Sequence, residues 1–181
     1  ATYGLRIDPS LEDPWGGALG SEYTLLFHTA PLPPGLTGTT GTNTVFLTPN
    51  DNSISMQATN VSSITLELAG LPLDDLLRMA GSGGFEILRT YFPEGATTWS
   101  QTLDLPPDRS QVVPVYLTPD RQPLAPGLYF LRFILPPEAG EITPYILVVG
   151  NTHITFKLSA EAALVWAVDL RSKQPLADAP V

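Results

Sequence analysis

The chain has 181 residues, which is enough for one or two domains with a buried core. Eighteen acidic residues against nine basic ones give a formal net charge of −9, which disfavours nucleic acid and anionic membranes as partners. The absence of cysteine excludes disulfides, thiolate metal sites, thiol catalysis and an internal thioester within these residues.

Residues 1–34 contain two predicted strands, at 3–8 and 22–29. A loop rich in proline, glycine and acidic residues separates them, and the prolines of residues 31–34 follow the second strand. Proline clusters of this kind end strands and separate domains. We therefore expect this segment to be the C-terminal part of a β domain.

Residues 35–150 have the pattern of a complete antiparallel β-sandwich. Apolar side chains alternate with polar ones in several segments, for example at Ile64, Leu66 and Leu68, and turn residues recur between the segments. The predicted strands are residues 44–48, 53–59, 63–69, 85–89, 97–105, 112–117, 127–135 and 142–149.

One short helix is predicted within this sandwich, over residues 71–80. Pro72 stands near its start and Gly81 follows its end, as helix termini favour. Leu73, Leu76 and Leu77 would form its buried face, so we expect the helix to cap the sandwich.

Tyr129 follows a Pro-Gly turn and lies just inside a predicted strand. In Greek-key sandwiches a tyrosine at such a corner often donates its hydroxyl to a backbone carbonyl. The alternative is an ordinary half-buried strand aromatic; both roles are structural.

Residues 151–181 have the pattern expected for the first strands of a further β module. Strands are predicted at 151–158 and 163–170, followed by a polar turn at 171–174 and the start of another strand. A lone hairpin is marginal in water. We therefore expect the chain to be a fragment of a longer, repetitive β-rich protein.

The two histidines are the first candidates for chemistry. His28 lies in an apolar strand and His153 at a predicted domain junction, and no Gly-x-Ser-x-Gly turn accompanies them. Their spacing does not fit a helical zinc-ligand pair either. We interpret both as structural; a hydrolase with a site at either histidine is the least favoured alternative.

Acidic residues are the second candidates. Asp8, Glu12 and Asp13 share one loop, whereas Asp51 and the pair Asp74–Asp75 lie elsewhere. Paired carboxylates can hydrolyse glycosides, but only within a sugar cleft, and none of these loops has EF-hand spacing. Solvated loop charge, with the pair at 74–75 favouring a helix N-terminus, is the simpler interpretation.

Tryptophans are the third candidates, because aromatic rings can stack on sugars. Trp15 lies in a Pro-Trp-Gly-Gly loop and Trp99 in a strand rich in Thr and Ser. Trp166 alternates with Leu164 and Val168, which predicts a core position. Three tryptophans without a shared pattern leave a carbohydrate-binding module as an alternative only.

Four segments resemble a known family. Residues 163–181, with a strand ending in Asp-Leu, a turn and then Lys-Gln-Pro-Leu, are similar to the opening of a macroglobulin domain of bacterial alpha-2-macroglobulins. Residues 60–68, running into a leucine-rich helix, and residues 124–130 also resemble domains of that family. Residues 23–31 resemble the tail of a bacterial Ig-like domain.

The resemblance implies three parts: the end of an Ig-like domain at 1–34, a macroglobulin-like sandwich at 35–150 and the start of another macroglobulin-like domain at 151–181. It implies a large extracytoplasmic protease trap in which a cleaved bait segment triggers entrapment. Many members also carry a Cys-x-Glu-Gln thioester, which this chain lacks. No catalytic, metal or cofactor-binding residue carries over.

These observations predict an all-β scaffold segment of a protease inhibitor that is not an enzyme and needs no cofactor. Its expected partners are the neighbouring domains of the parent chain and, through that chain, proteases. Nucleic acid is not expected as a partner, and neither is direct membrane insertion, because no apolar run reaches the roughly 18 residues of a membrane span. The alternative is an Ig-like surface adhesin or carbohydrate-binding module.

Overall fold

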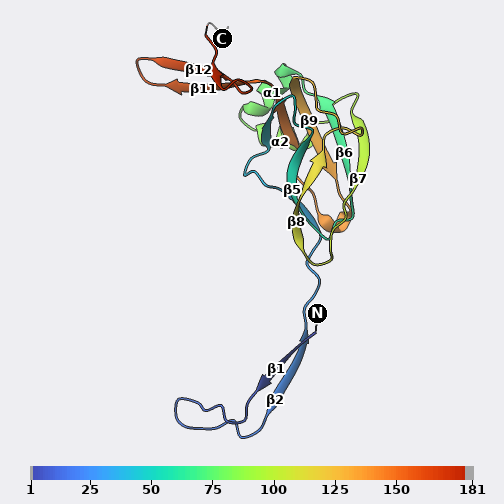
Figure 1. Ribbon diagram of the computed structural model, residues 1–181, viewed down its shortest axis with the longest axis vertical. Coiled ribbons are helices and arrows are strands. Elements are labelled where there is room, and N and C mark those ends of the chain that lie inside the picture. The colour runs from blue at the N-terminus through green and yellow to red at the C-terminus, as the bar shows by residue number, and fades with distance from the viewer. Residues whose placement is uncertain (1, 178–181) are drawn as a thin grey trace. The chain divides into compact units, whose positions relative to one another are not determined.

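The computed structural model describes residues 2–177 (Figure 1). The chain forms two compact units, one that ends at Leu32 and one that begins at Pro33. Within the described residues, no helix is both long and apolar enough to cross a membrane.

The N-terminal unit is a β-hairpin. Strands β1 (Thr2–Ile7) and β2 (Tyr23–His28) lie within one residue of the two predicted strands, and they pair antiparallel in the register Thr2 with His28. Alternate residues place the apolar side chains on one face of the ribbon, since directly opposed residues share a face. That face consists of Tyr3, Leu5, Ile7, Tyr23, Leu25 and Phe27.

The second unit contains a β-sandwich, which confirms the predicted all-β fold class. A five-stranded sheet has the order β4-β10-β9-β6-β7, and a three-stranded sheet has the order β3-β5-β8. All pairings are antiparallel except β10 with β4. The strands are β3 (Gly35–Gly38), β4 (Thr44–Leu47), β5 (Ser53–Thr59), β6 (Ser63–Gly70), β7 (Thr97–Thr102), β8 (Ser110–Tyr116), β9 (Gly127–Ile134) and β10 (Tyr145–Val149).

The core lies between these two sheets and follows the alternation of the strands. On β6, Ile64, Leu66 and Leu68 point inward and are buried, as their spacing predicts. Leu131 and Leu147 on the neighbouring strands are fully buried beside them. No buried side-chain nitrogen or oxygen among the described residues is without a hydrogen-bond partner.

Two helices cover part of the outer face of the larger sheet, where a single helix was expected. Helix α1 (Leu73–Ala80) is the predicted one, but Leu73 and Leu77 are exposed, so the predicted helix face is right at Leu76 and wrong at the other two leucines. The face toward the sheet is formed by Leu76 and Met79. These two side chains pack with Phe130 and Ile146, which project from the outer face of β9 and β10.

Helix α2 (Gly84–Thr90) replaces the strand predicted at residues 85–89, and that prediction is wrong. Gly83 precedes the helix with φ of 78°, a left-handed conformation that favours glycine. A Cβ on Gly84 would lie 1.6 Å from the carbonyl oxygen of Met79, so the two helices can meet closely only at a glycine. Leu88 is then buried against the sheet while Phe85 remains exposed.

Three smaller elements differ from expectation. Strand β3 follows directly after prolines, where no strand was predicted. A 3-10 turn, η1 (Pro137–Ala139), lies before β10, which begins later than predicted.

The chain after the sandwich forms a three-stranded ribbon. Strands β11 (Thr152–Leu158), β12 (Ala163–Asp169) and β13 (Gln174–Pro175) pair antiparallel in that order. The predicted strand after the polar turn therefore begins at Gln174, and the predicted segment beyond residue 177 lies outside the described residues.

Tyr129 occupies the predicted corner. Its hydroxyl donates a hydrogen bond of 2.9 Å to the carbonyl oxygen of Ala125, four residues earlier in the chain. The corner role is therefore confirmed, and the bond ties the start of β9 to the turn before it.

The side chain of Gln101 links the two sheets where β7 lies next to β8. The amide of Gln101, on β7, donates 2.8 Å to the carbonyl oxygen of Pro114 and accepts 2.9 Å from the N–H of Tyr116. One side chain thereby satisfies two backbone groups on the free edge of β8 and links the two sheets.

Candidate functional site

Neither histidine lies in a constellation that supports catalysis. Both His28 and His153 are exposed on strands of the terminal hairpins. The ring of His153 lies 3.3 Å from the hydroxyl of Thr155, on the same strand. A base needs a nucleophile and an orienting group within hydrogen-bond reach, and among residues 2–177 these histidines have this one hydrogen bond between side chains.

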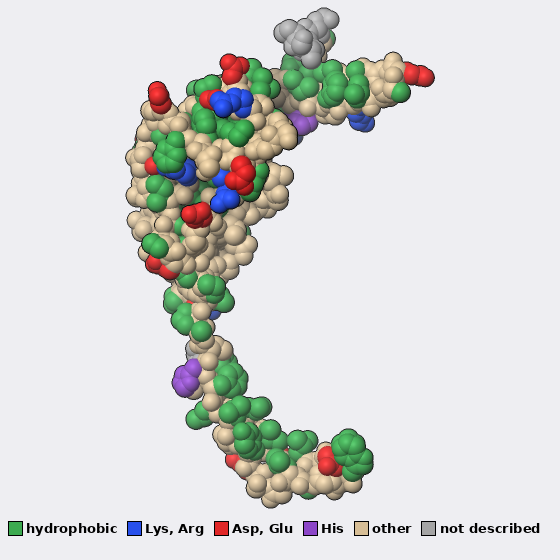
Figure 2. Space-filling model, turned by 180° about the vertical axis from the view of Figure 1, so that it is seen from behind, with side chains coloured by type: hydrophobic (Ala, Val, Ile, Leu, Met, Phe, Trp, Pro, Cys, Tyr) green, Lys and Arg blue, Asp and Glu red, His purple; other side chains and the backbone are tan. Residues whose placement is uncertain are grey.

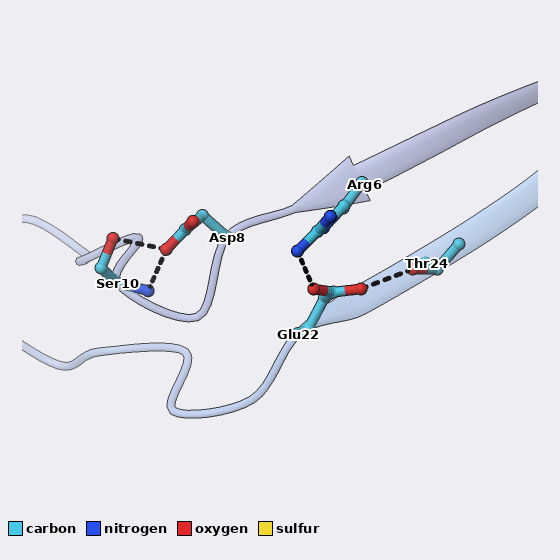
Figure 3. Close-up of polar contacts among 5 residues, drawn as sticks. All are labelled: Arg6, Asp8, Ser10, Glu22 and Thr24. Carbon is cyan, nitrogen blue, oxygen red and sulfur yellow. Dashed lines mark hydrogen bonds and ion pairs between the residues drawn. The ribbon is translucent and has the colours of Figure 1, made fainter.

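The carboxylates of the N-terminal loop shape turns. Asp8 accepts bonds from the hydroxyl and the N–H of Ser10, and these two bonds hold the pKa of Asp8 below its ordinary value (Figure 3). Asp13 accepts hydrogen bonds from the N–H groups of Trp15 and Gly17.

An ion pair joins the two sides of the hairpin. Arg6, on β1, lies 2.5 Å from Glu22, which precedes β2, and Glu22 also accepts a hydrogen bond from Thr24 (Figure 3).

Two of the candidate carboxylates in the second unit are also engaged in local contacts. Asp51 accepts bonds from the N–H and hydroxyl of Thr48. Asp75 accepts a bond of 2.8 Å from the Tyr91 hydroxyl, and burial of that phenol together with this bond raises the pKa of Tyr91. No group of three or more potential metal ligands occurs among residues 2–177.

The tryptophans do not form an aromatic platform. Trp15 is 90% exposed at the tip of the β1–β2 loop, whereas Trp99 is half-buried and packs against the core. Trp99 does line a groove of about 430 Å³ at the β7–β8 edge, together with Tyr116 and Arg121. The Arg121 guanidinium lies 4.5 Å from the centre of the Tyr116 ring and so occupies one face of that ring, while Trp99 is partly buried against the core.

The prediction that Trp166 is a core residue is wrong. Trp166 is 50% exposed, as is Leu164 beside it, although both alternate along β12 as expected. The alternation correctly identifies a shared face, but no second sheet covers that face within the described chain. A sequence period fixes which residues share a face and says nothing about what packs against it.

A second groove has a volume of about 930 Å³ and lies between α2 and the segment that follows β9. Three of its charged side chains have partners: Arg132 pairs with Glu67 and lies over the ring of Phe92, and Arg89 lies 3.8 Å from Glu86. Glu141 also lines the groove, but one carboxylate without a nucleophile or a second acid beside it does not make a catalytic pair.

The most unusual surfaces are the apolar faces of the two terminal hairpins, which Figure 2 shows as green side chains. In the β1–β2 hairpin, Tyr3 and Phe27 stack at 5.5 Å, yet both remain about half exposed. In the β11–β12 hairpin, Ile154, Phe156 and Leu158 share one face and are each more than half exposed. Contiguous apolar surface of this kind typically marks a place where protein packs.

The fold and these surfaces define a class: a small β-sandwich module flanked by hairpins with uncovered apolar faces. Solved structures of bacterial alpha-2-macroglobulin have a similar fold. Over 97% of this chain, the structure of native alpha-2-macroglobulin from Escherichia coli spanning domains MG0-NIE-MG1 matches with a TM-score of 0.65 at 9% identity. The resemblance predicted from the sequence is therefore confirmed at the level of the fold.

Two further structures agree. The Escherichia coli structure spanning NIE-MG1 matches 80% of this chain and 73% of its own, with a TM-score of 0.58 and 8% identity. A mutant of Salmonella alpha-2-macroglobulin matches 93% of this chain and 10% of its own, with a TM-score of 0.62 and 10% identity. No protein-family model and no curated protein matches the sequence.

The share of each structure that is matched shows the scale of the likeness. This chain spans 58% of the length of the three-domain Escherichia coli structure and a tenth of the Salmonella one. The similarity thus concerns a segment of several domains, and it concerns shape, because identities of 8–10% carry no residue-level correspondence.

Proposed function

We propose that this chain is a structural segment of a large bacterial, extracytoplasmic protease inhibitor of the alpha-2-macroglobulin type. One observation carries the proposal: nearly the whole chain, hairpins and sandwich together, matches a run of alpha-2-macroglobulin domains. A single sandwich is a common architecture that hosts many functions. A match that extends through consecutive modules is therefore stronger support for a shared architecture than a match to one sandwich.

We propose a division into three parts: the end of an Ig-like domain at 1–34, a macroglobulin-like sandwich at 35–150 and the start of a following domain at 151–181. The exposed apolar faces of both hairpins support this division, because such faces are stable in water only when another sheet or domain covers them. The partners of this segment are then neighbouring domains of the same polypeptide, and proteases through that polypeptide.

The segment acts as scaffold, without a catalytic or cofactor-binding role of its own. Asp13, Asp51 and Asp75 accept hydrogen bonds from nearby groups, and the two histidines are exposed on the hairpins. An adhesin or carbohydrate-binding role is not proposed, because in this groove Trp99 packs against the core and Arg121 occupies one face of the Tyr116 ring.

The test has two arms. The reading frame around this segment is translated, and the intact polypeptide is purified and incubated with a protease. A trap leaves the protease active on a small peptide substrate while blocking its action on a large protein. The isolated chain, in contrast, should block neither activity and should not react with methylamine. Inhibition by the isolated chain, or an intact polypeptide without any effect on proteases, would refute the proposal.

A further inference from the structure

Strand β7 is an open edge of the larger sheet. It lies at the end of the strand order, next to β6 alone, and at the side of the sandwich in Figure 1. Its sequence, Thr-Thr-Trp-Ser-Gln-Thr, has neither a charge nor a proline. Exposed edges without charge, proline or bulge are templates for pairing with another strand.

The other three edges of the sandwich are protected. Strands β3 and β4 have only four residues each, and β3 follows two prolines. Strand β8 contains Pro114, and its free carbonyl and N–H groups at Pro114 and Tyr116 are occupied by the Gln101 amide. Among the described strands of the two sheets, β7 is thus the one long edge that lacks such protection.

The register of β7 identifies which of its backbone groups face outward. The N–H of Leu103 donates to the carbonyl oxygen of Ser62, so these two opposed residues form a hydrogen-bonded pair. Hydrogen-bonded and non-hydrogen-bonded pairs alternate along an antiparallel ladder. The N–H and C=O groups of Thr98, Ser100 and Thr102 therefore point away from β6, toward the open edge.

These three residues are arranged symmetrically about Ser100. If a second β7 pairs antiparallel through a two-fold axis at Ser100, Thr98 of each copy lies opposite Thr102 of the other. All six outward groups of each strand then have a partner, which is the self-complementarity that a two-fold interface requires. The facing side chains are Thr with Thr and Ser with Ser, pairs that favour cross-strand contact.

We propose that β7 is a self-association edge, through which two copies of this chain join their five-stranded sheets into one continuous sheet. A pairing of two six-residue strands buries less than the roughly 1,200 Å² of a stable complex. Association is therefore weak and rises with protein concentration. The net charge of −9 on each copy opposes it, so it also strengthens when salt screens that repulsion.

The absence of cysteine makes a direct test of the register possible. In the proposed pairing, the two Ser100 Cα atoms lie about 5.5 Å apart, within the range of about 4.4–6.8 Å that a disulfide bridges. The two Thr98 Cα atoms lie roughly 14 Å apart, four residue rises along the strand. Ser100→Cys and Thr98→Cys thus differ only in whether the proposed pairing brings the new thiols together.

The first experiment compares these variants under mild oxidation. Ser100→Cys should form a disulfide-linked dimer at least about tenfold faster than Thr98→Cys, since pairing replaces random collision with a high effective concentration. A mixture of Thr98→Cys and Thr102→Cys chains should cross-link as mixed dimers. Equal rates for Ser100→Cys and Thr98→Cys would overturn the proposal.

The second experiment measures mass against concentration by analytical ultracentrifugation. The unaltered chain should show a reversible monomer–dimer equilibrium. Thr98→Lys/Thr102→Glu should dimerise more strongly, because opposite charges then face each other across the two-fold axis, whereas Thr98→Lys/Thr102→Lys should dimerise less. The two variants share the lysine opposite Glu67 on β6, so its local effect cancels. A monomer at every concentration, or equal behaviour of the two variants, would contradict the proposal; neither result bears on the scaffold function.

Discussion

The central sandwich and the two terminal hairpins both place apolar side chains on alternate residues, but only the sandwich buries them. Leu131, on β9, is fully buried between two sheets and is held there from both sides. Leu25, on β2, has the same side chain on the same kind of strand and is 44% exposed. The difference lies in what faces the strand and not in the strand itself.

This comparison assigns different roles to the two kinds of region. The sandwich has its own core, two helices over its outer face and the Gln101 side chain that links its two sheets, so we expect it to fold by itself. Each hairpin is a two- or three-stranded ribbon, which is marginal in water by itself. In the proposed scaffold, the hairpins are therefore the parts of this chain whose stability depends on neighbouring domains.

The largest effect is expected from Leu131→Ala in the core. Removing a fully buried leucine side chain typically costs about 2–5 kcal/mol. The matched control is Leu25→Ala in the β1–β2 hairpin, which should leave the free energy of unfolding of the sandwich almost unchanged. Urea unfolding of both variants measures the contrast, and equal losses would mean that the hairpin face is buried as well.

Gly38→Ala should be next in size. A Cβ at this position would lie 2.2 Å from the hydroxyl oxygen of Tyr145, and this tyrosine is only 5% exposed, so the ring or the backbone of β3 has to shift. Overpacking of this kind costs about 1–3 kcal/mol.

Tyr145→Phe provides the control for this substitution. It removes the clashing hydroxyl, so Gly38→Ala should cost less in the Tyr145→Phe background than in the unaltered chain. Thermal unfolding of the four chains in this cycle measures the coupling. An unchanged penalty would mean that another contact restricts residue 38.

Tyr129→Phe should have a smaller effect. The substitution removes only the hydroxyl that donates to Ala125, a bond worth about 1 kcal/mol. Tyr3→Phe is the control. Tyr3 is half exposed on the hairpin, so loss of its hydroxyl should not change the stability of the sandwich. Denaturant midpoints that are the same for both variants would deny Tyr129 its role at the corner.

Deletion of residues 1–32 should have the smallest effect. The first unit is separate from the second, so the free energy of unfolding of the sandwich should change by less than about 0.5 kcal/mol. Urea unfolding of the shortened chain, monitored by tryptophan fluorescence, measures this change in free energy. A loss of several times that amount would mean that the hairpin supports the sandwich.

Strands were predictable where two-residue alternation and turn residues agree. Strand β5 has the predicted bounds because Ile54, Met56 and Ala58 alternate with polar residues. Helix α2 was not predictable in this way, since Phe85, Ile87 and Leu88 fit a short strand as well as one helical turn. The close contact of Gly84 with Met79, which decides for the helix, exists only in the folded chain.

The functional surfaces were predictable only in part. The Pro-Gly turn before Tyr129 predicts its corner hydrogen bond. No short sequence pattern predicts the Gln101 bridge, because it joins two strands that belong to different sheets. The exposure of Trp166 was missed for a related reason: alternation identifies a face, but not the sheet that covers it. The open edge of β7 follows from strand order, which short sequence patterns do not specify.

Hydrogen exchange of the isolated chain tests the central claim most directly. The account predicts slow exchange for the hydrogen-bonded amides of β5, β6, β9 and β10, at rates set by global unfolding, and fast exchange throughout β1–β2 and β11–β12. Protection of the hairpins equal to that of the sandwich would contradict the account, because it would make them self-sufficient and remove the need for neighbouring domains.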